Sequence, residues 1–505
     1  MAIIGNIIKG VISLTDTLIS ETNHTQAQEK VLKNLLETAK DTQFGKKHQF
    51  KTILNSTNLQ EVFADSVPYF DYHKINEQWW YKLHQGEKDV TWPDAPSYFA
   101  LSSGTTGKSS KKIPVTDAMI DAIKSAGIKQ VLSLNNFDLP ADFFEKEIMM
   151  LGSSTDLQEN NNHLEGEISG ISASNIPFWF KGYYKPGENI AKIDDWDERV
   201  SQIAKNAKNW DIGALSGIPA WIELMLQEVI TYHNVENIHQ IWPNLKVYTS
   251  GGVAFGPYEK SFKALLGKPV TVIDTYLASE GYIATQTRPE TDAMQLNTEN
   301  GIYFEFVPMN PKYIKQDGSL KKNAPSISLK DVELDKDYIL IISTVSGAWR
   351  YLIGDTIKFT NIEKAEIKIT GRTKFFLNTV GSQLSVNKMD DAMKHLEETF
   401  ATKISEYTIC AKRFDDGEFY HSWYLGTALK ASNTEIAKTL DTFLKKANKN
   451  YKVARSKALK GVKVQVIPVE KFHAWSDQNK KKGGQVKMER VMKEKKFKKW
   501  EAFVN

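Results

Sequence analysis

The sequence predicts an α/β protein with a large N-terminal domain, built of β-sheets flanked by helices, and a small C-terminal α+β domain. Strand-like apolar runs alternate with helical patterns, and no repeat or low-complexity tract is apparent. A length of 505 residues exceeds what a single hydrophobic core supports, so two or more domains are expected. The hydrophobic content of 41% and charged content of 25% indicate a folded globular chain rather than a disordered one.

Individual segments predict particular strands and helices. The runs YILIIST (338–344) and VKVQVI (462–467) are apolar and β-branched, which is typical of strands. Two segments instead show helical spacing of apolar residues. These are 433–447, where Asn433 or Thr434 can cap and Ile436, Leu440, Phe443 and Leu444 share a face, and 196–207, where Val200, Ile203 and Ala207 align.

The domain joint is expected near residues 371–376. A strand-like segment, EIKIT (366–370), ends in GRTKFF, and Gly371 allows the backbone to change direction there. We therefore predict an N-terminal domain of residues 1–373 and a C-terminal domain of residues 374–505, both of ordinary size.

Charge and cysteine content exclude several functional classes. Lys and Arg number 65 against 61 Asp and Glu, and a net charge of +4 argues against a dedicated nucleic-acid binder. The single cysteine, Cys410, excludes an intramolecular disulfide framework and fits a reducing, cytoplasmic setting. Asn6 and Lys9 interrupt the apolar N-terminus, which predicts an amphipathic helix rather than a signal peptide, and no run is long enough to span a membrane.

The segment SSGTTGKSSKKIP (102–114) is a candidate phosphate-binding loop. Its glycines, hydroxyls and lysines can offer N–H groups, O–H groups and positive charge to phosphate oxygens. Only two residues separate Gly104 from Gly107, whereas a Walker A loop needs four, so a kinase-like or GTPase-like loop is disfavoured. A polar surface turn is the alternative interpretation.

Two further motifs could line a nucleotide crevice. TYLASEG (275–281) follows the strand-like VTVID (270–274), so Tyr276 could stack on a base, Ser279 could bind phosphate and Glu280 could hold a divalent cation. A strand end followed by a polar turn would look the same. In WRYLIGDTIKF (349–359), Asp355 is placed to accept the ribose hydroxyls.

Basic residues complete the set of candidates. Arg372 could bind ribose or phosphate. Taken alone, Arg372 would more often form a surface ion pair, and Asp355 would more often be a turn residue. In GGQVKMERVM (483–492), Gly483 and Gly484 precede Lys487 and suit a loop that approaches a ligand closely. The other lysines of 480–499 are interpreted as a solvated face.

In order and spacing, these motifs resemble the adenylate-forming superfamily, and most closely a bacterial member of the Gretchen Hagen auxin-responsive family of acyl-acid amido synthetases. The resemblance extends from about Val67 to Lys487. Its other segments are VPYFDYHKI (67–75), LGSSTDL (151–157), DIGALSGIPAW (211–221), SGGVAFGPYEKSF (250–262), IYFEFVP (302–308) and RYLIGD (350–355). The chain departs from the family pattern at Ser110, Ala278 and Trp349.

The resemblance implies a role for each matching residue. Those implied to bind ATP are the phosphate-loop residues Ser102, Ser103, Thr105 and Lys111, the segment Tyr276, Ala278, Ser279 and Glu280, the adenine neighbour Tyr303, and Asp355 with Arg372 at the ribose and hinge. Glu280 is also implied as the Mg²⁺ ligand, and Lys487 as the catalytic lysine. Lys374 marks the hinge about which the C-terminal domain would swivel between the two half-reactions.

The implied activity is an ATP-dependent ligase that adenylates a small carboxylic acid and then forms an amide bond with an amine, such as an amino acid. ATP and Mg²⁺ are the expected cofactors, and a monomer without nucleic-acid or membrane partners is expected. The acyl pocket is expected within 151–221, where the apolar candidates are Ile171, Phe178, Trp179 and Trp221. The alternatives are an acyl-CoA ligase and a non-catalytic nucleotide-binding protein.

Overall fold

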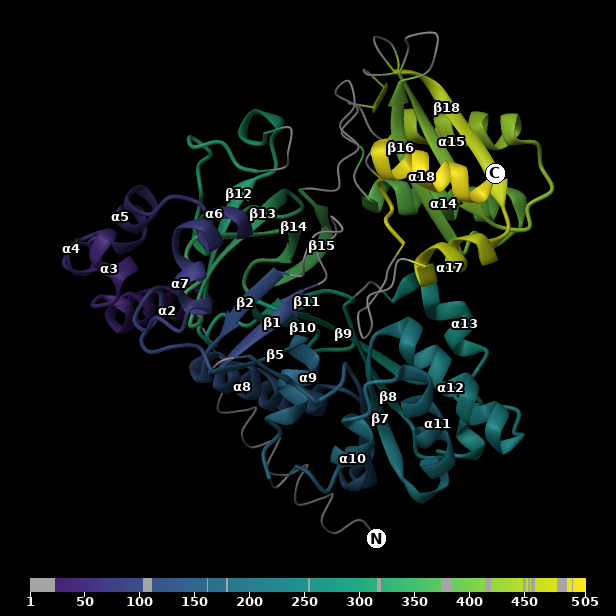
Figure 1. The fold of residues 1–505 in the computed structure, drawn as a ribbon, viewed down its shortest axis with the longest axis horizontal. Helices are drawn as coiled ribbons and strands as arrows, with labels where there is room; N and C mark the ends of the chain where they lie inside the picture. The colour runs from purple at the N-terminus through teal and green to yellow at the C-terminus, as the bar shows by residue number, and fades with distance from the viewer. Residues whose placement is uncertain are drawn as a thin grey trace.

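The computed structural model describes residues 23–505 apart from 103–110, 161, 179, 253–254, 316–318, 374–383, 385, 414–418, 448–450, 453–454, 456–458, 479–487 and 493. In the described residues the strands form three sheets (Figure 1). The helix expected at the N-terminus lies outside these residues. None of the described helices has both the length and the apolar composition that a membrane crossing requires.

The largest sheet has 11 strands and forms the centre of the N-terminal part. Its spatial order is β12 (Ile302–Pro308), β13 (Asp337–Thr344), β14 (Tyr351–Asn361), β15 (Glu366–Arg372), β11 (Met294–Leu296), β10 (Gly281–Thr285), β9 (Thr271–Ala278), β8 (Val247–Gly251), β7 (Ile212–Gly217), β3 (Glu147–Leu151) and β6 (Tyr184–Lys185). The strands from β9 to β6 pair in parallel, and those from β12 to β9 pair antiparallel. The sheet therefore joins a parallel half to an antiparallel half at β9.

Each half of this sheet has its own hydrophobic core. The antiparallel half packs against a second sheet and the early helices, which are α2 (His24–Ala39), α3 (Gln43–Lys47), α4 (Phe50–Leu54), α5 (Leu59–Ser66), α6 (Tyr72–Ile75), α7 (Tyr81–His84) and α8 (Asp117–Ser133). The parallel half packs mainly against α11 (Trp196–Asn206) and α12 (Pro219–His233), with α10 (Glu188–Ala191) and α13 (Glu259–Lys263) nearby (Figure 1). Helix α9 (Ile168–Ser174) instead contacts the second sheet and contributes to the core of the antiparallel half.

The second sheet carries the two strands that flank the candidate phosphate loop. Its order is β2 (Lys111–Val115), β1 (Tyr98–Ser102), β5 (His163–Gly166) and β4 (Gln158–Asn160). Strands β1 and β2 are antiparallel, and Ser102 pairs with Lys111 at the end of their register. The loop thus begins and ends at one point of this sheet.

The C-terminal part contains the third sheet, with the order β16 (Glu406–Arg413), β17 (Phe419–Gly426) and β18 (Leu459–Ile467). Its helices are α14 (Val386–Phe400), α15 (Asn433–Ala447), α17 (Val469–Gln478) and α18 (Glu494–Val504). Its two hydrophobic clusters contain only residues from Leu384 onward, and Figure 1 shows this part beside the larger body. A separate C-terminal unit agrees with the predicted architecture, whereas the boundary at 373/374 adjoins residues outside the description and stays a prediction.

Most predicted elements are confirmed with small changes in their bounds. The runs 338–344 and 462–467 lie within β13 and β18, and the helices over 433–447 and 196–207 are α15 and α11. The predicted cap of α15 is wrong, because the Ser432 hydroxyl accepts the N–H of Glu435 at 3.2 Å. Asn433 instead accepts the N–H of Val466 on β18 at 3.3 Å, so its side chain ties the helix to the sheet.

Strand β9 extends the predicted 270–274 segment to Ala278 and carries a partly buried carboxyl at Asp274. Burial and the neighbouring Asp292 carboxylate raise the pKa of Asp274 to about 6. The unfolded chain releases this proton near pH 4, so the folded state loses stability as pH rises from about 4 to 6.

We expect Asp274→Asn to stabilise the protein by about 1–2 kcal/mol at pH 7.5, because the amide removes the cost of a partly buried charge. At pH 4 the gain should vanish. Thermal unfolding at both pH values measures this, and an equal gain at both would contradict the assignment.

Candidate active site

The parallel strands end at one edge of the large sheet, where a ligand crevice is expected in open α/β sheets. Strands β3, β7 and β8 end there in Leu151, Gly217 and Gly251. At Gly217 φ is +157°, and an added Cβ would lie 2.7 Å from the Leu151 carbonyl oxygen. Only glycine allows β3 and β7 to approach so closely, so the ends of these two strands are tightly packed at this edge.

Three predicted site residues contact one another: Tyr276 and Arg372 both bind the carboxylate of Asp355. This residue lies on β14 and is 4% exposed, and its carboxylate accepts hydrogen bonds from the Tyr276 hydroxyl of β9 and from Nε of Arg372. A second guanidinium nitrogen of Arg372 lies 3.4 Å from the other carboxylate oxygen. Asp355 and Arg372 are also register partners on β14 and β15. Segments almost 100 residues apart are thereby brought to one carboxylate.

The charges at this cluster reinforce one another. The Asp355 carboxylate raises the pKa of Arg372, so the guanidinium remains charged. Burial, and next the Asp355 charge, raise the pKa of Tyr276 well above its ordinary value. Tyr276 therefore remains a neutral donor. An ionised carboxylate has about four lone-pair directions, and Tyr276 and Arg372 together use three of them, which leaves acceptor capacity for one further hydroxyl.

Glu280 is a second, separate carboxylate of the site. It lies in the two-residue turn between β9 and β10 and is 8% exposed. Burial raises its pKa, whereas the positive charge of Lys111 and the neighbouring Tyr351 hydroxyl act in the opposite direction. The structure thus brings Lys111, at the end of the phosphate loop, into electrostatic contact with Glu280.

Several predicted residues fall outside this description. Ser103, Thr105, Lys374 and Lys487 lie outside the described residues, as does Trp179, and the side chain of Ser102 is likewise not described. Ala278 ends β9 and pairs with Gly281, and Ser279 occupies the turn beside Glu280; both are partly buried. Their assigned contacts with nucleotide stay predictions.

Tyr303 occupies a different place from the other predicted residues. It lies on β12, is 2% exposed, and its ring packs 6.1 Å from that of Phe63 in the hydrophobic core. Strand β13 separates it from the strand of Asp355. Contact with adenine, as the resemblance implies, would require this core to open, and that role stays a prediction.

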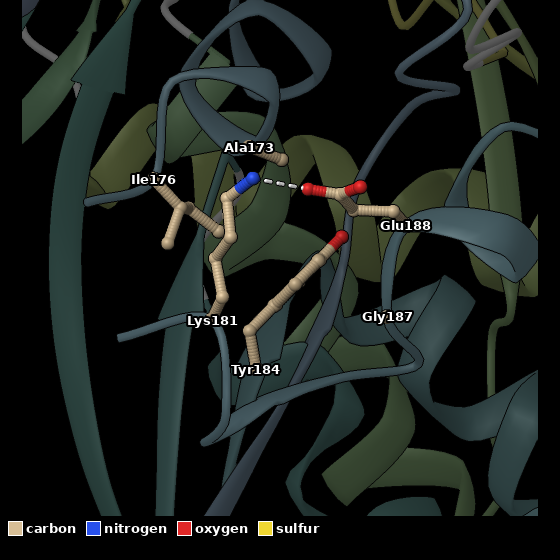
Figure 2. A pocket seen from close by; sticks show the side chains of 6 residues that line it. All are labelled: Ala173, Ile176, Lys181, Tyr184, Gly187 and Glu188. Carbon is tan, nitrogen blue, oxygen red and sulfur yellow. Dashed lines mark hydrogen bonds and ion pairs between the residues drawn. The ribbon is translucent and has the colours of Figure 1, made fainter. Parts of the chain in front are cut away.

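The described residues predicted for the acyl pocket do not line one common cavity. Ile171 is fully buried in the core, Phe178 is 85% exposed, and the Trp221 ring packs 5.1 Å from that of Trp196. A cavity of about 310 Å³ lies in the same region, lined by Ala173, Ile176, Lys181, Tyr184, Gly187 and Glu188 (Figure 2). An ion pair of 2.5 Å between the exposed side chains of Lys181 and Glu188 crosses it. None of its lining residues belongs to the Asp355 cluster.

The sequence interpretation missed a buried ion pair directly before the site. Arg350 and Glu305 are each 4% exposed, and their charged groups approach to 2.9 Å. Arg350 also donates to the Val67 carbonyl oxygen at 2.6 Å and to the Ser326 hydroxyl at 2.7 Å. The signal was the basic residue inside the apolar strand run WRYLI, since a charge in such a run needs a buried partner.

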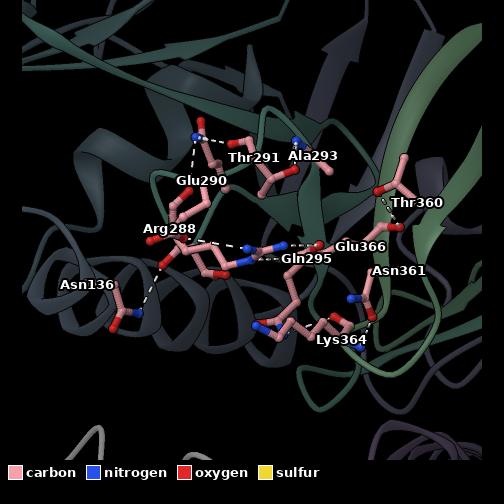
Figure 3. Close-up of polar contacts among 12 residues, drawn as sticks. Asn136, Arg288, Glu290, Thr291, Ala293, Gln295, Thr360, Asn361, Lys364 and Glu366 are labelled. Atoms are coloured by element: carbon pink, nitrogen blue, oxygen red, sulfur yellow. Dashed lines mark hydrogen bonds and ion pairs between the residues drawn. The ribbon is translucent and has the colours of Figure 1, made fainter.

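A second ion pair supports β15, the strand that carries Arg372. Arg288 donates to both carboxylate oxygens of Glu366, at 2.7 and 2.9 Å, and Glu366 is 2% exposed (Figure 3). The side-chain amide of Gln286 donates to the carbonyl oxygens of Arg288 and Thr291 at 3.2 and 2.6 Å. This network fixes the 286–293 loop against the start of β15.

Comparison with known proteins gives a consistent family. The GH3 family N-terminal domain matches residues 18–207, the central domain 296–372 and the C-terminal domain 386–496. Indole-3-acetic acid-amido synthetase GH3.2 of Arabidopsis thaliana is 27% identical over 189 residues, which cover 35% of this chain and 34% of that protein. Indole-3-acetic acid-amido synthetase GH3.5 of the same plant is 22% identical over 465 residues, covering 76% and 74%. The chain spans about a third of the length of the first relatives that it matches.

Solved structures agree on the fold. GH3.15 acyl acid amido synthetase matches with a TM-score of 0.75 at 16% identity, covering 98% of this chain and 95% of that one. A 2-hydroxyisobutyryl-CoA ligase in complex with 2-HIB-AMP matches with a TM-score of 0.58 at 14% identity, covering 95% and 92%. These matches confirm the predicted α/β fold with a C-terminal domain. With three successive domain models in order along it, the chain belongs to the GH3 family.

Proposed function

We propose that this protein is an ATP-dependent acyl-acid amido synthetase that adenylates a small carboxylic acid and conjugates the acyl group to an amine, such as an amino acid. The observation that carries the proposal is the cluster of Asp355, Tyr276 and Arg372 beside the Glu280–Lys111 pair. It combines an acceptor for a ribose hydroxyl with charges for a triphosphate. The relatives named as amido synthetases for indole-3-acetic acid and as a jasmonoyl–amino acid synthetase support the acid and amino-acid substrates.

The first half-reaction joins two anions, so it requires positive charge and in-line placement. The carboxylate of the acid attacks the α-phosphorus of ATP, the bond to the bridging oxygen breaks, and pyrophosphate leaves. In this scheme Asp355 fixes the ribose through a hydroxyl. Lys111 lies where the phosphate loop ends and offsets the charge of the phosphates. In the second half-reaction the amine attacks the acyl carbonyl, loses a proton, and AMP leaves.

Mg²⁺ fits the donor set only in combination with ATP. In the described part of the chain no group of three or more His, Cys, Asp or Glu residues is arranged to hold a metal. Glu280 supplies one buried carboxylate, and Mg²⁺ is commonly bound through one or two carboxylates, substrate phosphates and waters. Glu280 would therefore hold the ion, which would neutralise charge on the triphosphate.

Two assays test the proposed function. The first is exchange of labelled pyrophosphate into ATP with a library of carboxylic acids, which detects adenylation whatever the acceptor. The second offers a panel of amino acids and, separately, CoA, and identifies the product by mass spectrometry. An amide product is expected. A thioester alone would indicate an acyl-CoA ligase, and nucleotide binding without exchange would indicate a non-catalytic binder. Cytoplasmic location, a monomeric state and a bacterial source stay predictions.

We expect Lys487→Ala to slow adenylate formation about 100-fold, because a preorganised charge on the reacting phosphate is removed. Amide formation from a supplied acyl-adenylate should change far less, since the C-terminal domain would have turned Lys487 away. Single-turnover measurements of each half-reaction separate the two effects. Lys480→Ala is the control from the same basic stretch, and equal losses in both half-reactions of Lys487→Ala would contradict this division.

A further inference from the structure

An aromatic cradle lies beneath Lys111 and Glu280, and it consists of Tyr72, Trp80 and Tyr351. The Lys111 ammonium lies 5.4 Å from the centre of the Tyr72 ring. Burial, and next the charge of the Glu280 carboxylate, raise the pKa of Tyr351 well above its ordinary value, so a protonated hydroxyl neighbours Glu280. Each charged group of the pair thus interacts with a different tyrosine.

Trp80 fixes both tyrosines. Its ring stacks on that of Tyr351 at 5.7 Å and 27°, and meets that of Tyr72 edge-on at 6.2 Å and 61°. Trp80 is fully buried, yet its indole N–H finds no hydrogen-bond partner among the described residues. An unpaired buried donor is costly, which indicates that this position uses the ring rather than the N–H.

The backbone around the cradle is also unusual. Trp80 ends a π-helical turn, Asn76–Trp80, between α6 and α7, and such turns often occur at functional sites. The Tyr72 hydroxyl accepts the backbone N–H of Lys112 at 3.0 Å, which ties α6 to β2 directly after Lys111. Tyr72 therefore contacts both the side chain of Lys111 and the backbone of the next residue.

We propose that Tyr72 and Tyr351, held by Trp80, are positioning residues that orient Lys111 and Glu280 toward the triphosphate of ATP. This inference rests on the proposed function. Tyr351 acts through its hydroxyl, which is the polar group that interacts with the Glu280 carboxylate. Tyr72 acts mainly through its ring face, which attracts the ammonium group and limits its movement.

The two roles predict different outcomes for conservative variants. Tyr351→Phe should lower kcat of pyrophosphate exchange about tenfold to hundredfold, since the hydroxyl that interacts with the charged Glu280 carboxylate is lost. The KM for the acid should change less than about threefold, because the acid lies outside this contact. Tyr72→Phe keeps the ring and should stay within about threefold of wild type. Tyr72→Leu should lose about tenfold.

The control is Tyr338→Phe, a buried tyrosine on β13 whose hydroxyl accepts the N–H of Glu333 at 2.9 Å. It removes the hydroxyl of a buried tyrosine away from the cradle and should retain kcat. Calorimetry of ATP binding, with Mg²⁺ and with EDTA, adds a readout apart from activity. Wild type should bind ATP more tightly with Mg²⁺, and Tyr351→Phe should lose most of that gain while matching Tyr338→Phe in unfolding midpoint.

Each outcome decides a separate point. Normal kcat and a normal Mg²⁺ effect in Tyr351→Phe would overturn the role of Tyr351. Equal losses in Tyr72→Phe and Tyr72→Leu would overturn the role of the Tyr72 ring. If wild type exchanges pyrophosphate and Tyr351→Phe, Tyr72→Phe and Tyr72→Leu all match it, the role of the cradle is rejected and the proposed function is retained. A wild-type protein that neither exchanges pyrophosphate nor binds ATP rejects the proposed function and the cradle together.

Discussion

Arg350→Met is expected to lower the free energy of unfolding by about 3–5 kcal/mol, because it leaves the Glu305 carboxylate buried without its counter-charge. Both side chains are 4% exposed, so water cannot replace the lost partner. The substitution also removes the donor that Arg350 supplies to the Val67 carbonyl oxygen and to the Ser326 hydroxyl, which keeps its own bond to Glu305 at 2.8 Å. A methionine fills much of the same volume, so lost packing contributes little.

Urea unfolding followed by tryptophan fluorescence measures the change. The informative control is the double variant Arg350→Met with Glu305→Gln, which removes the uncompensated charge as well. It should recover a substantial part of the loss, because most of the cost lies in the isolated carboxylate rather than in the missing pair. If the single and double variants were equally destabilised, the loss would come from the backbone contacts of Arg350 instead. A single loss below about 1 kcal/mol would contradict the burial of the pair.

Sequence reasoning succeeded where local pattern and function coincide. The periodicity that predicted α15 also places Ile436, Leu440 and Leu444 in the core. Asp355 and Arg372 could be found because a polar residue interrupts or ends an apolar strand run, and the structure brings them into direct contact. Their shared contact with Tyr276 depends on β9, β14 and β15 belonging to one sheet, which no local pattern specifies.

The missed features depend on long-range packing. Tyr351 looked like another apolar strand residue, and its electrostatic interaction with Glu280 links β14 to the β9–β10 turn. Tyr72 and Trp80 lie in an aromatic-rich segment where most rings fill the core. Only the fold shows that these rings lie under Lys111. Similarly, the cap of α15 was misassigned because β18 engages Asn433 from 33 positions away.

The largest effect on catalysis is expected for Asp355→Ala, which should lower kcat/KM for ATP about 1,000-fold. A hydrogen bond from a ribose hydroxyl to a charged carboxylate is worth about 1.5–3 kcal/mol, which is about tenfold to hundredfold because about 1.4 kcal/mol corresponds to tenfold. The variant also releases Tyr276 and Arg372, which now donate to this carboxylate. The kcat/KM of Asp355→Asn should fall between those of wild type and Asp355→Ala, since the amide oxygen still accepts hydrogen bonds but carries no charge.

Comparing ATP with 2′-deoxy-ATP separates ribose recognition from a general loss of structure. Wild type should prefer ATP about tenfold or more, because the deoxy substrate leaves one acceptor position of Asp355 unused. In Asp355→Ala that preference should disappear, since neither nucleotide finds the carboxylate. A misfolded or loosened site would weaken both substrates equally and keep their ratio. If Asp355→Ala still discriminated between the two as wild type does, the ribose would be bound elsewhere and the orientation of ATP at this sheet edge would have to be reversed.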